Sequence, residues 1–224
     1  MANEVLKKRI VMKKGFTLSE VLITLGIVGL IAALTIPAVM KNYKNRLYVS
    51  QLQKVYSQLS DATKSVISDE NANNFYETTA GVVNSCSDAN NGKCEKGPGF
   101  FLNNYFKPLK RNCGDPTKTG TCVAATYKSI TGADAGKLAG DYCIQTTNSA
   151  VICMASPKDG FSHIYVDVNG TSEPNITGRD AFSMTIQSDG TITDYKDTDA
   201  DKCSTPSSAG CLNKIIDAGW KMEY

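Results

Sequence analysis

The chain opens with a basic segment and continues into a long apolar one. Five of the first fourteen residues are Lys or Arg, and residues 16–40 are almost entirely apolar. As a helix, about 25 residues extend about 37 Å, enough to cross a hydrocarbon layer of about 30 Å. The pattern predicts a membrane-spanning helix with its N-terminal side in the cytoplasm and the rest of the chain exported.

After Pro37 the helix is expected to continue with a different pattern. In residues 41–72, apolar side chains recur at spacings of three and four, and polar residues fill the other faces, which is typical of an amphipathic helix. Asn and Asp accumulate at residues 69–74, where we expect the helix to end. The apolar positions are Tyr48, Leu52, Val55, Leu59, Ala62 and Val66. We expect this stripe to pack on the core of its own domain rather than form a free coiled coil.

Residues 73–224 are expected to form a globular domain with an antiparallel sheet. The predicted strands are 142–146, 150–155, 161–168, 182–187 and 191–195. Asn169-Gly170 is a strong tight-turn signal that closes the third of these strands, and Ser188-Asp189-Gly190 joins the last two as a hairpin. The predicted fold class is therefore α+β, with a long N-terminal helix packed on an antiparallel sheet.

All eight cysteines follow the apolar segment, which places them on the exported side, where disulfides form. Their wide spacing does not fit a zinc site built on close pairs. Many connectivities are possible, and we predict the sequential one: Cys86–Cys94, Cys113–Cys122, Cys143–Cys153 and Cys203–Cys211. The third pair has the best support, because two predicted strands place Cys143 opposite Cys153.

Glu20 is anomalous because it is a carboxylate within the apolar segment. Burying it in the bilayer costs about 2.5 to 3.5 kcal/mol unless it finds a partner or a proton. If the chain were cut after Gly15, the new α-amino group of Phe16 would lie at the same depth, and that of a neighbouring copy could pair with Glu20. The alternative is a protonated or interfacial Glu20 in an ordinary membrane anchor.

The segment Lys14-Gly-Phe-Thr-Leu-Ser-Glu-Val-Leu-Ile, continuing to Pro37, resembles the leader and first helix of type IV pilins and type II secretion pseudopilins. The resemblance implies cleavage after Gly15 by a prepilin peptidase that also methylates Phe16. It further implies an assembly role for Glu20, the fifth residue of the mature chain, and for Pro37, which matches the helix-kinking proline of the family. The implied organisation is leader 1–15, filament-core helix 16–40, amphipathic half 41–72 and head domain 73–224.

The same resemblance implies partners and a location. The partners are the prepilin peptidase/methyltransferase, other pilin or pseudopilin subunits in a helical polymer, and an inner-membrane assembly platform with its ATPase. The chain would first sit in the inner membrane as a single-pass protein and then enter an extracellular or periplasmic filament. Two alternatives stay open: an adhesive or tip minor pilin, and a membrane-anchored binding domain that does not polymerise.

Features that would indicate an enzyme are scarce, and we predict no catalytic residue, cofactor or metal. His163 is the single histidine, lies on a predicted strand and is read as structural or exposed. Gly132–Leu138 resembles a phosphate-binding loop but has one residue too few between its glycines. Nucleic-acid binding is not indicated, because the basic residues are concentrated in the leader. The leader holds five basic residues and one Glu, so the formal net charge would change from +2 for the whole chain to −2 for a chain starting at Phe16.

Two further groups of residues have more than one interpretation. Asp167, Asn169 and Asp180 are interpreted as turn caps, with calcium ligation as the alternative, although the EF-hand spacing is absent. Trp220 and its aromatic neighbour Tyr224 are expected to pack on the domain, with contact to a neighbouring subunit or ligand as the alternative.

Overall fold

The computed structural model describes residues 15–86, 94–138, 140–158, 160–205 and 209–224. Residues 1–14 of the predicted leader lie outside this part of the chain. The long helix α1 runs from Leu18 to Asp69. The chain divides after Tyr43 into two units, and the second, Lys44–Tyr224, is the compact unit that we call the head.

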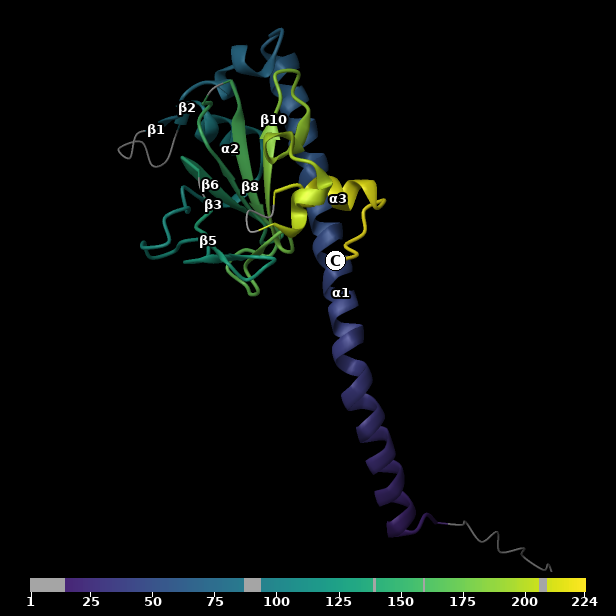
Figure 1. Cartoon of the computed structure of the whole chain (residues 1–224). Coiled ribbons are helices and arrows are strands. Elements are labelled where there is room, and N and C mark those ends of the chain that lie inside the picture. Colours follow the sequence, from purple (N-terminus) through teal and green to yellow (C-terminus); the bar gives the residue numbers. More distant parts are fainter. Residues whose placement is uncertain (1–14, 87–93, 139, 159, 206–208) are drawn as a thin grey trace, which may run out of the picture. The chain divides into compact units, whose positions relative to one another are not determined.

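The second half of α1 is the amphipathic helix that the sequence predicts. All six apolar positions of its stripe are buried, none more than 6% exposed. The helix ends where Asn71 takes a left-handed φ of 50°. The N–H of Ala72 then donates to the carbonyl of Ile67 at 3.0 Å, which satisfies a carbonyl of the last turn. The Lys44–Asp69 part of α1 therefore belongs to the same compact unit as the sheet (Figure 1).

The remaining elements are short. Two further α-helices are α2 (Pro98–Tyr105) and α3 (Cys211–Asp217), and 3₁₀ turns occur at Phe75–Glu77, Thr79–Gly81, Tyr195–Asp197 and Ala200–Ser204. The strands are β1 (Ser85–Cys86), β2 (Cys94–Lys96), β3 (Pro108–Arg111), β4 (Tyr127–Ser129), β5 (Asp134–Gly136), β6 (Tyr142–Thr146), β7 (Val151–Met154), β8 (Ser162–Asp167), β9 (Ile176–Thr177), β10 (Ala181–Ile186) and β11 (Ile192–Asp194).

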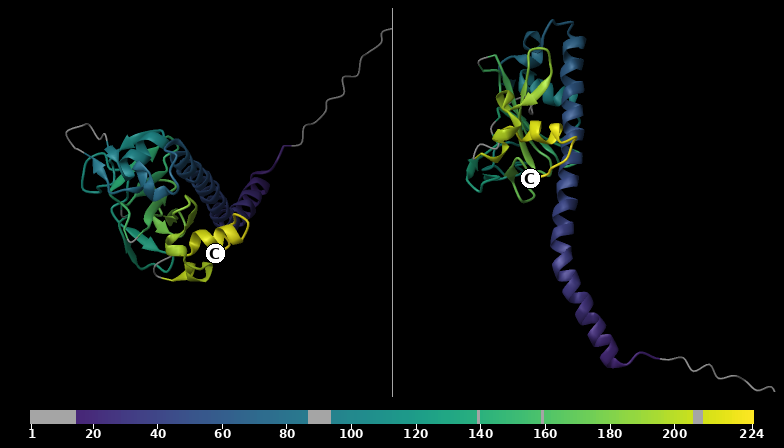
Figure 2. Two further views of the ribbon diagram at one scale, coloured as in Figure 1. Left: turned by 90° about the horizontal axis from the view of Figure 1, so that it is seen from above. Right: turned by 45° about the vertical axis from the view of Figure 1, so that its right-hand side comes forward.

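The main sheet is mixed rather than purely antiparallel. Its order is β3-β6-β7-β8-β10-β9-β4-β5, with β11 on β10, while β1 and β2 form a separate pair. Strands β6, β7, β8 and β10 are antiparallel, as expected, but β9 runs parallel to both β10 and β4. The fold is α+β, and Figure 2 shows the head half of α1 alongside the sheet in both views.

The two faces of the sheet support two cores. Alternate residues of β8 and β10, such as Ile164 and Met184, join the stripe of α1 in the larger core. The opposite face carries Cys143, Val151 and Cys153, which form a smaller core together with residues of the 113–138 segment. Because successive side chains of a strand point to opposite faces, the central strands β6, β7, β8 and β10 contribute to both cores.

Asn169-Gly170 does not form the two-residue hairpin that this pair usually indicates. The chain turns after β8, but the connection to its antiparallel partner β10 includes the short strand β9. Main-chain groups of this long connection bond to two buried carboxylates, Asp167 and Asp180. These bonds hold the connection in place, while β8 and β10 still pair along their whole length, from Asp167 with Ala181 to Ser162 with Ile186.

The C-terminal residues pack against α1. The ring of Trp220 meets that of Tyr56 edge-on, with centroids 5.5 Å apart. Met222 is buried, and the hydroxyl of Tyr224 donates to the carbonyl of Gly178 at 2.6 Å. In the single chain these aromatic residues therefore serve the core of the head.

Four disulfides brace the head, and each joins cysteines that are neighbours in the sequence: Cys86–Cys94, Cys113–Cys122, Cys143–Cys153 and Cys203–Cys211. Cys143 and Cys153 lie directly opposite each other on β6 and β7. Both are buried in the smaller core, at 2% and 0% exposed. This bridge therefore both closes a loop and fills space.

Replacing Cys143 and Cys153 together by alanine is expected to lower the free energy of unfolding by about 3 kcal/mol, because the unfolded chain loses a cross-link. The matched control is Cys86→Ala with Cys94→Ala, which opens a loop of similar length at half-buried cysteines. Denaturant unfolding of both proteins measures the difference. A smaller loss for the buried pair than for the control would contradict its role in the core.

Candidate functional site

The segment around the predicted cleavage position begins the long helix. Gly15 and Phe16 precede α1, and Phe16 is 87% exposed. Thr17 stands at the N-cap position. Its main-chain N–H and its hydroxyl donate to Oε2 of Glu20 at 2.8 and 2.9 Å, while the N–H of Glu20 donates to Oγ1 of Thr17 at 3.2 Å. This reciprocal arrangement is a capping box.

The capping box gives Glu20 a local partner that the sequence analysis missed. The signal was present as Thr17-Leu18-Ser19-Glu20, which matches the S/T-x-x-E pattern of a helix start. The carboxylate therefore has two functions available within the same segment. It satisfies free donors at the start of the helix, and it keeps acceptor capacity for a cation from elsewhere.

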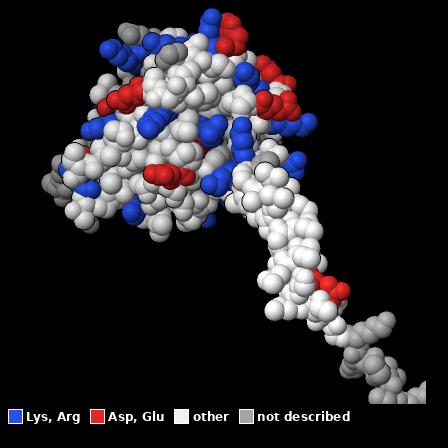
Figure 3. All heavy atoms as spheres, turned by 60° about the horizontal axis from the view of Figure 1, so that its bottom comes forward, with Lys and Arg blue, Asp and Glu red and all other residues white. Residues whose placement is uncertain are grey.

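The helix that follows is apolar on all sides. From Leu18 to Met40 its large side chains are exposed, for example Leu22 at 61% and Leu30 at 65%. Its best 18-residue window has a mean hydropathy of 2.4 and is long enough to span a membrane. Figure 3 shows this stretch as nearly free of charged atoms, whereas basic and acidic groups are interspersed over the visible face of the head.

The helix itself satisfies the hydroxyls of two threonines within the apolar stretch. The hydroxyl of Thr24 donates to the carbonyl of Val21, and that of Thr35 to the carbonyl of Ile31, both at 3.0 Å. In a bilayer such internal bonds remove the cost of an unpaired hydroxyl.

Pro37 lies inside α1, which continues past it. Its ring nitrogen lacks a proton, so the carbonyl of Ala33 loses its helical donor.

Asp167, Asn169 and Asp180 come together around the connection between β8 and β10. The buried carboxylate of Asp167 accepts from the hydroxyl of Tyr127 at 2.7 Å and from the N–H of Asn169 at 3.1 Å. Asp180, also buried, accepts from the N–H groups of Asn175 and Ile176 at 2.9 and 2.6 Å. The two carboxylates therefore organise this connection through hydrogen bonds.

Burial raises the pKa of Asp167 to about 7, and burial also raises the pKa of Asp180. An unfolded aspartate has a pKa of about 3.9, so the folded head binds protons more tightly than the unfolded chain. The contribution of these two aspartates to the free energy of unfolding is therefore largest at low pH and is lost as pH rises through 7. Between pH 5 and pH 8, we expect Asp167 alone to lower the free energy of unfolding by about 2 to 3 kcal/mol.

Asp167→Asn should flatten this pH dependence, as measured by denaturant unfolding across that range. Asp189→Asn is the control. Asp189 is exposed, and hydrogen bonds from Thr191 lower its pKa, so it is already ionised over the range. An unchanged slope in Asp167→Asn would show that this aspartate is ionised in the folded head at pH 5.

The histidine and the phosphate-loop-like segment that the sequence singled out are both parts of the sheet structure of the head. His163 lies on β8, with Nδ1 3.2 Å from Oγ1 of Thr185, and its ring centroid is 4.7 Å from that of Tyr195. Burial and the charge of Lys196 lower the pKa of His163, which keeps it neutral near pH 7. Gly132–Leu138 forms a turn and strand β5 instead of the loop and helix that a phosphate site needs.

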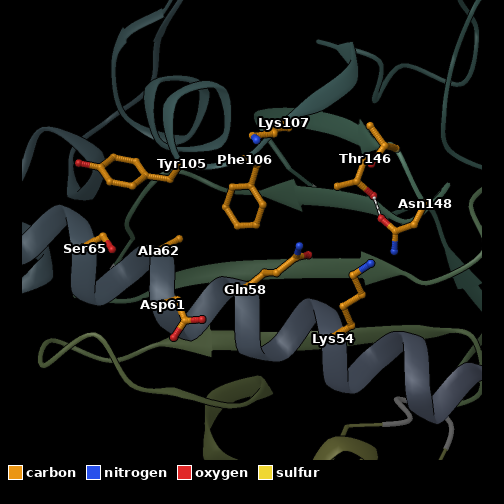
Figure 4. A pocket seen from close by; sticks show the side chains of 11 residues that line it. Lys54, Gln58, Asp61, Ala62, Ser65, Tyr105, Phe106, Lys107, Thr146 and Asn148 are labelled. Carbon is orange, nitrogen blue, oxygen red and sulfur yellow. Dashed lines mark hydrogen bonds between the residues drawn. The ribbon is translucent and has the colours of Figure 1, made fainter.

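One hollow of about 440 Å³ lies beside α1 in the head. Lys54 and Gln58 project from the helix toward Asn148, and the ring of Phe106 points down toward the helix (Figure 4). The hydroxyl of Thr146 donates to Asn148 at 2.7 Å. The residues that line this hollow do not place a general base next to a nucleophile. Within the described residues, no group of three or more His, Cys, Asp or Glu side chains could hold a metal ion.

Comparison with known proteins identifies the N-terminal segment. A family model described as the prokaryotic N-terminal methylation motif matches residues 11–36, which include Gly15, Phe16, Thr17 and Glu20. No curated protein and no solved structure matches the chain. The apolar helix and the motif are those of a membrane-anchored, exported protein. The chain therefore carries the signal motif of the type IV pilins and pseudopilins, which marks it as a pilin-like exported protein.

Proposed function

We propose that the protein is a structural subunit of a type IV pilus or a type II secretion pseudopilus, polymerised through its N-terminal helix. The observation that carries this proposal is the apolar surface of α1 between Leu18 and Met40, which is exposed on all sides and lies largely within the methylation motif. Such a helix needs a lipid environment before assembly and neighbouring helices after it. A filament core made of these helices supplies the second environment.

Maturation would occur between Gly15 and Phe16. A Cβ atom added at Gly15 meets nothing within 4 Å, so the fold of this chain does not itself require glycine there. Gly26 and Gly29 are equally free of neighbours in the single chain. We infer that Gly15 is required by the peptidase, and that Gly26 and Gly29 loosen the helix within a filament.

After cleavage, the carboxylate of Glu20 would receive a second partner. The α-amino group of Phe16 in a neighbouring subunit is a cation at the same depth of the apolar layer. Pairing the two would neutralise both charges and set the axial step between subunits. The assembly platform and its ATPase would supply the energy of extraction, since neither the motif nor the described residues provide a nucleotide site.

Gly15→Val is expected to block maturation and leave the head folded. Intact mass and N-terminal peptide analysis of protein from its own membranes measure this directly. Wild-type protein should begin at a methylated Phe16, and the variant should retain residues 1–15. A wild-type chain that keeps these residues in cells with an active prepilin peptidase would contradict the proposal and favour a permanently anchored binding domain.

A further inference from the structure

A second, larger hollow lies on the sheet face opposite α1. Its volume is about 850 Å³, within the range of about 300 to 1,000 Å³ that is usual for small-molecule sites. His163, Gln187 and Thr193 line it from β8 and from the β10–β11 hairpin. Four residues outside these strands complete the wall. Lys158 and Phe161 precede β8, and Tyr195 and Lys196 follow β11.

The main chain around the hollow is held in place by specific contacts. The N–H of Lys196 donates to Oγ1 of Thr185 at 2.9 Å, and the same hydroxyl oxygen lies 3.2 Å from Nδ1 of His163. The N–H of Tyr195 donates to buried Asp194 at 2.7 Å. Lys196 has a left-handed φ of 51°, which is uncommon for a residue with a side chain. Such outliers persist where surrounding contacts enforce them, often at binding sites.

The lining combines three kinds of groups. Tyr195 and His163 present adjacent rings, and Phe161 is 43% exposed. Gln187 and Thr193 offer an amide and a hydroxyl, which bond to each other at 2.8 Å. Lys158 and Lys196 supply positive charge, and none of the described residues that line the hollow is a carboxylate. The Lys196 ammonium lies 5.4 Å from the centre of the Tyr195 ring, so charge and aromatic surface meet at one point.

This combination favours one class of ligand. Aromatic rings pack against the C–H faces of sugar rings, amides and hydroxyls bond to sugar hydroxyls, and an ammonium pairs with a carboxylate. A phosphate ligand would be better served by arginine or by a helix N-terminus, and neither lines this hollow. We propose that the hollow binds an acidic saccharide, a sugar unit that carries a carboxylate, as in uronic acids.

This proposal does not depend on polymerisation, so it can be tested on the full chain as a monomer in detergent. Isothermal titration calorimetry with tetragalacturonate provides the probe, and the fully methyl-esterified tetrasaccharide is the matched ligand without charge. We expect saturable binding of the acid and at least about tenfold weaker binding of the ester. Maturation assays then test the filament role separately.

Variants locate the binding. Lys158→Gln and Lys196→Gln should each weaken tetragalacturonate binding about fivefold or more, because each removes one partner of the carboxylates. Lys128→Gln removes the same charge from an exposed position on β4 and should change nothing. Tyr195→Ala should weaken binding of both the acid and the ester, with near-ultraviolet circular dichroism as the check that the head stays folded.

Three results would overturn the proposal. One is the absence of saturable binding to wild-type protein. A second is equal loss in Lys128→Gln and Lys196→Gln, which would reveal general attraction to a charged surface. The third is equal affinity for the acid and its ester, which would remove any role for the two lysines of the hollow.

Discussion

Glu20→Val is expected to leave cleavage after Gly15 intact and to reduce the yield of filaments at least about tenfold, because an incoming subunit would lose the proposed ion pair in the apolar layer. Filaments sheared from cells and quantified against total protein give the yield, and N-terminal peptide analysis confirms cleavage. The variant also removes the acceptor of the capping box at Thr17. Two further variants separate these effects.

Glu20→Gln keeps an oxygen that can accept from the N–H of Thr17 but has no charge to pair with a neighbouring α-amine. Thr17→Val removes the capping hydroxyl and leaves the carboxylate. If Glu20 sets the axial step between subunits, Glu20→Gln should fail to assemble and Thr17→Val should assemble nearly as well as wild type. Normal filaments from Glu20→Gln, with failure of Thr17→Val, would assign the effect to the start of the helix instead.

Leu59→Ala is expected to lower the free energy of unfolding of the head by about 4 kcal/mol, the usual cost of removing a fully buried leucine side chain and leaving a cavity. Leu59 is 0% exposed and lies in the middle of the stripe that packs on the sheet. The single tryptophan reports on this interface during denaturant unfolding, because Trp220 contacts Tyr56 on the same helix.

Gln58→Ala is the matched control for this variant. Gln58 is the preceding residue of α1 and is exposed, so its truncation should change the free energy of unfolding by less than about 0.5 kcal/mol. Both substitutions create alanine in the same helical turn, so the difference between them isolates burial. Equal stability of the two variants would mean that the stripe is not packed on the sheet in solution.

The sequence predicted those parts of the fold in which the contacting residues are close together in the chain. The spacing of Leu52, Val55 and Leu59 determines which face of α1 is buried, because the helical period leaves little choice. The short connection between β6 and β7 likewise aligns Cys143 with Cys153. In both cases the residues that meet are close in the sequence, so few alternative arrangements compete.

Other features depend on contacts between distant segments. Strand β9 pairs with β4 through Lys128 and Ile176. Because β9 is only two residues long, it has no hydrophobic periodicity from which a strand could be predicted. At Asn169-Gly170 the hairpin signal was overridden by hydrogen bonds to Asp167 and Asp180, which stabilise a longer connection. The hollow of about 850 Å³ could not be predicted either, because its lining residues come from separate parts of the chain and meet only once the sheet has formed.

The position of the disulfides bears on how the protein would respond to mechanical force. Every bridge closes a short loop within the residues that follow α1, and α1 contains no cysteine. A pull along the helix would therefore meet no covalent cross-link to the sheet. It would be resisted by the apolar stripe and by bonds such as that from Thr63 to the carbonyl of Gly190, at 2.6 Å. Under tension, the helix should detach from the sheet while each disulfide-closed loop remains intact.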